Sequence, residues 1–108
     1  MDKRLMSLCD NVTEAHTRIK NDFKEIDPIV GVSKKMRESG IGADVMTIDC
    51  LRSGKRIILI LHDHQPDSIS YQFTFKVQDP AAQFEEVPFT DASEDKLYDW
   101  MKSYSTNI

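Results

Sequence analysis

The sequence has few cysteines and no long apolar segments, the features that characterise disulfide-rich, membrane and secreted proteins. It contains only two cysteines in 108 residues, Cys9 and Cys50, too few for a disulfide framework, and we expect both thiols to be reduced and buried. No segment approaches the roughly 20 consecutive apolar residues of a transmembrane helix, and no long apolar stretch follows the N-terminal Met-Asp-Lys-Arg as it would in a signal peptide. These absences predict a cytoplasmic protein without membrane contact.

Short sequence motifs that are typical of enzymes are also absent. The chain has no Cys-x-x-Cys or His-Glu-x-x-His metal motif, no glycine-rich phosphate loop and no Gly-x-Ser-x-Gly nucleophile turn. It contains only four glycines and four prolines, and no repeat or linker divides it. We therefore expect one domain spanning residues 1–108. The missing motifs favour a non-enzyme over an enzyme, and we expect no cofactor.

Positive charge is scarce in the second half of the chain. Residues 1–56 carry 11 Lys and Arg against 9 Asp and Glu, whereas residues 57–108 carry 3 against 9. Nucleic acids and anionic membranes would be repelled by this acidic half, so we expect neither as a partner. A basic protein would be attracted, although solubility alone also accounts for the acidic residues.

The strongest pattern is a pair of strands in the middle of the chain. Residues 57–61 form an unbroken, β-branched apolar run that is typical of a central strand covered on both faces. In residues 69–76 the apolar side chains alternate with polar ones, which predicts a strand at or near an edge with its apolar side in the core. Residues 43–51 predict a strand that precedes these two, and residues 84–89 a short fourth strand held at the edge by Pro88.

Segments with the apolar spacing of helices precede and follow these strands. Apolar residues three and four apart predict a helix over residues 2–26, a second, shorter helix that begins at Pro28 and ends before Gly40, and a C-terminal helix capped by Ser93 or Asp91. The C-terminal helix would present Leu97, Trp100, Met101 and Tyr104 on one face. The predicted fold is α+β, with two N-terminal helices, a three- or four-stranded antiparallel meander and a C-terminal helix, all helices packed on one face of the sheet.

His62-Asp63-His64 is the one cluster that suggests chemistry. Two histidines two residues apart on a strand point the same way, and with Asp67, or with Asp49 and Cys50 across the hairpin, they would begin a zinc or nickel site. A histidine acting as a general base beside Cys50 is a further hypothesis. The corresponding functional alternative is a metal- or small-ligand-binding domain centred on this hairpin, but a solvated turn is the favoured interpretation of these polar residues.

The aromatic residues concentrate in the same acidic half. We expect most of them in the core, but some could lie at the surface beside acidic side chains and bind protein. The leading functional hypothesis is a small protein-interaction module that binds another protein or forms a homodimer, through the edge of the strand at 69–76 or through an acidic, aromatic surface. An inhibitor or immunity-type protein that neutralises a basic partner is a related alternative. The candidate binding residues are Phe73, Phe75, Glu85, Glu86 and Trp100.

Overall fold

An antiparallel sheet of five strands organises the structure, which is a computed structural model that describes residues 3–23, 28–50, 54–75 and 84–106. The strands lie side by side in the order in which they follow along the chain, β1-β2-β3-β4-β5. The elements are α1 (Lys3–Asp22), β1 (Ile29–Ser33), α2 (Lys35–Glu38), β2 (Ala43–Cys50), β3 (Lys55–His62), β4 (Ser68–Phe75), β5 (Glu85–Pro88), the 3₁₀ turn η1 (Phe89–Asp91) and α3 (Glu94–Thr106). The predicted α+β meander is thus confirmed, with one strand more than the largest number expected.

Strand β3 lies at the centre of the sheet, as its apolar run predicts. It pairs with β2 over its whole length, from Ala43 opposite His62 to Cys50 opposite Lys55, and with β4 on its other side. Its residues from Ile57 to Leu61 are all buried, so both faces of the strand are covered. This continuous burial explains why the segment has no alternation of apolar and polar residues.

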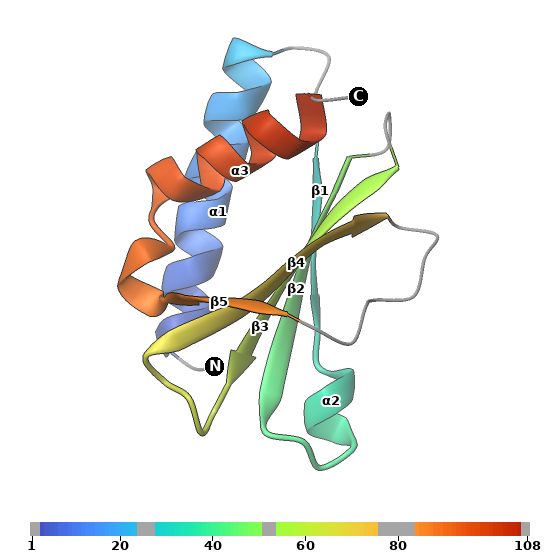
Figure 1. The fold of residues 1–108 in the computed structure, drawn as a ribbon, viewed down its shortest axis with the longest axis vertical. Helices are drawn as coiled ribbons and strands as arrows, with labels where there is room; N and C mark the ends of the chain where they lie inside the picture. The colour runs from blue at the N-terminus through green and yellow to red at the C-terminus, as the bar shows by residue number, and fades with distance from the viewer. Residues whose placement is uncertain (1–2, 24–27, 51–53, 76–83, 107–108) are drawn as a thin grey trace.

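Helices α1 and α3 cover one face of the sheet (Figure 1). Helix α1 buries residues spaced three and four apart, and α3 contributes Leu97 and Met101, which are fully buried. Ser93 precedes α3, and its Oγ accepts a hydrogen bond from the backbone N–H of Lys96 at 3.2 Å, the contact expected of an N-cap. The side chain of Tyr104, predicted on the same stripe, lies outside the described residues. The main core comprises Leu5, Leu8, Val12, Ala15, Ile19, Met46, Ile48, Ile57, Leu59, Leu61, Ile69, Ala92, Leu97 and Met101.

The second N-terminal helix was predicted wrongly. Residues 29–33 form the edge strand β1, which pairs with β2 from Ile29 opposite Asp49 to Ser33 opposite Val45, and only the single turn of α2 follows it. β-Branched residues and Gly31 disfavour a helix, and the free edge of β2 offers the segment backbone hydrogen bonds instead. Gly40 then ends α2 with a φ of 91°, as expected for one of the two glycines there.

The alternation in β4 predicts the faces of the strand correctly but not the burial. Ile69 is buried, yet Phe73 and Phe75 on the same face are 40% and 41% exposed, while Gln72 and Thr74 on the opposite face are buried. The predicted fourth strand is present as β5, which pairs with β4 from Ser68 opposite Pro88 to Tyr71 opposite Glu85. Strand β4 therefore lies one position in from the edge.

A smaller apolar cluster lies on the other face of the sheet, where Ala43, Ile58 and Ile60 pack with Met36 of α2 and with Phe84. The prediction that all helices pack on one face is therefore wrong for α2, which contacts the face opposite α1 and α3. Among the described residues, no helix is both long enough and apolar enough to cross a lipid bilayer.

Candidate functional site: two exposed surfaces and a charged cluster

The predicted metal cluster lies where β3 ends and turns towards β4. The rings of His62 and His64 are close, with centroids 5.4 Å apart. Asp63, between them in sequence, is held by Arg37, which donates from Nη1 and Nη2 to the two carboxylate oxygens at 2.9 Å each. Asp67 is exposed in the turn. Within the described part of the chain, no three His, Cys, Asp or Glu side chains are grouped so that they could hold a metal ion.

The hairpin register separates the histidines from the partners expected across the sheet. His62 lies opposite Ala43, whereas Cys50 lies at the far end of the same pair of strands, opposite Lys55. Asp49 lies only one position nearer, opposite Arg56, and forms an ion pair with it, in which Arg56 Nε and Nη2 donate at 2.6 and 2.8 Å. The hypothesis of a Cys50–histidine pair is therefore wrong, because Cys50 lies next to the turn of the hairpin and His62 lies at its open end.

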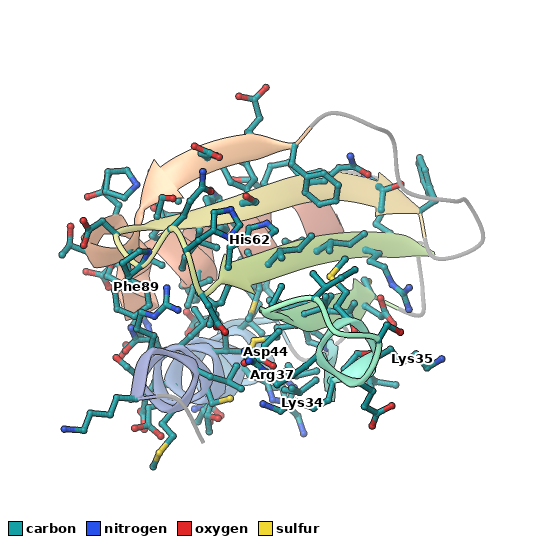
Figure 2. The ribbon with its side chains drawn as sticks, turned by 90° about the horizontal axis from the view of Figure 1, so that it is seen from below. Lys34, Lys35, Arg37, Asp44, His62 and Phe89 are labelled. Atoms are coloured by element: carbon teal, nitrogen blue, oxygen red, sulfur yellow. The ribbon has the colours of Figure 1, made fainter. Side chains whose placement is uncertain are left out.

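A charged cluster is formed by Lys34, Arg37, Asp44 and Asp63 at the end of the sheet where α2 meets β2. Figure 2 shows Lys34, Arg37 and Asp44 close to one another. The Asp44 side chain is only 1% exposed and accepts hydrogen bonds from Lys34 Nζ at 3.0 Å and from Arg37 Nε and Nη2 at 3.0 and 3.2 Å. These donors lower the pKa of Asp44, Arg37 first, against the opposing effect of burial. Arg37 likewise lowers the pKa of Asp63. The cluster fastens α2 to β2 and to the turn after β3.

Close packing and one further cation support this charged cluster. A Cβ atom on Gly42 would lie 2.8 Å from Asp63 Oδ2, so only glycine fits there without moving the carboxylate. The backbone N–H of Asp63 donates to the carbonyl of Gly42 at 2.8 Å. Arg4 of α1 donates to the backbone carbonyl of His62 at 3.3 Å. Each carboxylate of the cluster thus serves the fold, which favours a structural role for these charges over a catalytic one.

The aromatic surface, which comprises Tyr71, Phe73, Phe75 and Trp100, lies where α3 meets β4. The Trp100 ring is 4.7 Å from the Tyr71 ring and 5.7 Å from the Phe73 ring, centroid to centroid. The Phe73 and Tyr71 rings are 5.6 Å apart, and Phe75 extends the same face of β4. Three of the predicted binding residues, Phe73, Phe75 and Trp100, are therefore brought together on one side of the sheet.

The two predicted acidic residues lie on opposite faces of β5. Glu85 is the register partner of Tyr71 and shares its face, whereas Glu86 is the partner of Ser70 and points to the other face. Glu86 therefore does not belong to the aromatic surface. Lys96, which no sequence pattern indicated, has its Nζ 5.9 Å from the centroid of the Trp100 ring.

A second exposed apolar surface lies on the edge strand β1 and was missed from the sequence. Val30 and Val32, on one face of the strand, are 36% and 44% exposed, and Ile29, on the other face, is 51% exposed. The sequence pattern predicted a helix for this segment. β-Branched residues around a glycine are the signal that would have indicated a strand.

No family model matches this chain, and no match was found among the curated proteins or the solved structures.

Proposed function

We propose that this protein is a non-enzymatic protein-interaction module that binds a basic segment of another protein through its aromatic surface. The observation that carries the proposal is the exposure of Phe73 and Phe75, 40% and 41%, beside the ring cluster of Trp100. Large aromatic side chains dominate the binding energy of protein interfaces because they bury much area at little cost in side-chain entropy.

The acidic balance of the second half of the chain supports a basic partner. Residues 57–108 have a threefold excess of acidic over basic side chains. The aromatic surface itself is bordered by charges of both signs, with Glu85 opposite Tyr71 and Lys55 opposite Phe75. Aromatic ring faces attract ammonium and guanidinium groups, and Lys96 already approaches Trp100 in this way. The arginines and lysines of a partner would find the same kind of interaction at Phe75, which is 41% exposed. An inhibitor that neutralises a basic protein is one form that this function would take.

The arrangement of the ionisable side chains supports a binding role over catalysis. The pKa values of Arg37, Asp44 and Asp63 are all shifted by ion pairs that fasten α2 to the sheet. The pKa of Arg56 is raised by its hydrogen bonds to Asp49 within the sheet. These perturbed groups stabilise neighbouring elements of the fold, so their shifts have a structural cause.

Random peptide display on the immobilised protein tests the proposal. We expect enrichment of peptides that contain arginine or lysine, with affinity that falls as salt is added because exposed charges are screened. Phe75→Asp should abolish the enrichment, and Met6→Asp is the matched control because Met6 is an equally apolar exposed residue on α1. The proposal fails if no peptides, or acidic ones, are enriched, or if Phe75→Asp binds the same peptides as the wild type.

Metal binding by His62 and His64 is a second candidate function, favoured by the 5.4 Å separation of their rings. Two imidazole nitrogens would supply two of the four ligands of a zinc ion, and solvent the others. Calorimetric titration of zinc into the wild type and His64→Ala decides the question. Heat that disappears in the variant supports the site, and absence of heat in the wild type rules it out.

A further inference from the structure

We propose that two copies of this chain join along β1 to form a homodimer with one continuous sheet, a role separate from peptide binding at the aromatic surface. Strand β1 ends the sheet, and within the described residues no strand pairs with its outer side. The outward backbone N–H and C=O groups of such an edge bind an extended chain. The geometry therefore specifies a strand as the occupant.

The two edges of the sheet differ in how they are protected. Strand β5 is only four residues long and contains two glutamates and a proline, features that discourage strand pairing. Strand β1 has the sequence Ile-Val-Gly-Val-Ser, with no charge and no proline. The first lysine after it, Lys34, is held by Asp44 at 3.0 Å, so its charge is tied into the cluster at the strand end. Of the two edges of the sheet formed by the described residues, the β1 edge is therefore the one suited to pairing.

The sequence of β1 is complementary to itself about its central residue. In an antiparallel pair centred on Gly31, Val30 of each copy lies opposite Val32 of the other, and Ile29 opposite Ser33. Val30 and Val32 share the face of the sheet that carries Met46 and Ile48, their register partners in β2. The dimer would thus unite four partly exposed valines in one apolar patch. Gly31 places no side chain at the symmetry axis, where the two copies approach each other.

Sedimentation equilibrium across the micromolar range tests the dimer. We expect the wild type to have twice the mass of the single chain and Val30→Lys to dissociate at least tenfold more readily. Met6→Lys, an exposed apolar residue replaced on α1, should remain dimeric. A wild type that is monomeric throughout, or a dimer that Val30→Lys leaves unchanged, overturns the proposal.

A compensating variant tests the register. In the double variant Val30→Lys/Val32→Glu, each lysine faces a glutamate of the other copy in the antiparallel arrangement centred on Gly31, so dimerisation should be restored relative to Val30→Lys. A double variant that dissociates as readily as Val30→Lys contradicts this arrangement. Because the two surfaces are separate, Phe75→Asp should leave the dimer intact and Val30→Lys should leave peptide binding intact. The two proposals can therefore fail independently.

Discussion

Removal of the buried charge of Asp44 should destabilise the fold measurably. The carboxylate accepts three hydrogen bonds from Lys34 and Arg37 and is 1% exposed. Charge-assisted hydrogen bonds contribute roughly 1.5–3 kcal/mol each, but the two cationic side chains are 38% exposed and regain water when their partner is lost. For Asp44→Asn, which keeps the shape of the side chain, we expect a loss of about 2 kcal/mol in the free energy of unfolding.

This loss translates into a change in melting temperature. A chain of 108 residues has an unfolding entropy for which about 2 kcal/mol corresponds to a decrease of roughly 8–10 °C. Calorimetry at neutral pH measures it, with Glu14→Gln on the exposed side of α1 as the control that removes an equal charge. A melting temperature within about 2 °C of the wild type would refute the assignment of Asp44 as a stabilising buried charge.

The pH dependence of stability provides a second test of the same carboxylate. The pKa of Asp44 is below its usual value of 3.8, so at acidic pH the unfolded chain binds a proton that the folded chain does not. The contribution of Asp44 is therefore complete above the unfolded pKa and is lost as the pH falls through the folded pKa. The melting temperatures of the wild type and Asp44→Asn should converge as the pH is lowered below about 4. A difference that stays constant over that range would contradict the argument.

Three further changes test the core, the turn and the aromatic surface. Leu59→Ala removes a central side chain that is 1% exposed and should cost roughly 2–5 kcal/mol in urea denaturation; a loss below about 1 kcal/mol would place the residue outside the packed core. Gly42→Ala should displace the Asp63 carboxylate, because its Cβ would lie 2.8 Å from Oδ2, and should shift the Arg37 side-chain NMR signals; unchanged signals would contradict the close packing. Trp100→Ala should lower the affinity for basic peptides at least tenfold, and an unchanged affinity would exclude Trp100 from the binding surface.

The middle of the chain could be predicted because one physical factor dominates there. The apolar run from Ile57 to Leu61 is buried on both faces and needs no knowledge of the neighbouring elements to be recognised as a central strand. The helical stripes of α1 and α3 are equally independent of context. Pro88 likewise indicated an edge position, since proline cannot donate a hydrogen bond to a neighbouring strand.

Residues 29–33 could not be predicted from spacing alone. Ile29, Val30 and Val32 fit a helical stripe, but the availability of the β2 edge decides their conformation, and that edge lies outside the segment itself. The exposure of the β4 side chains could not be predicted for the same reason. Alternation places Phe73 and Phe75 on the helical face, whereas the extent of the α1 and α3 layer decides whether the rings are covered. The candidate binding surfaces depend on these long-range relations.

The binding site itself is tested most directly by nuclear magnetic resonance of the ¹⁵N-labelled protein during titration with a short arginine- and lysine-containing peptide. We predict that the Trp100 indole N–H signal and the backbone amide signals of Phe73 and Phe75 shift in a saturable manner, with smaller changes at high salt. Shifts confined to residues 29–33, or no saturable shifts at all, would contradict the proposed function.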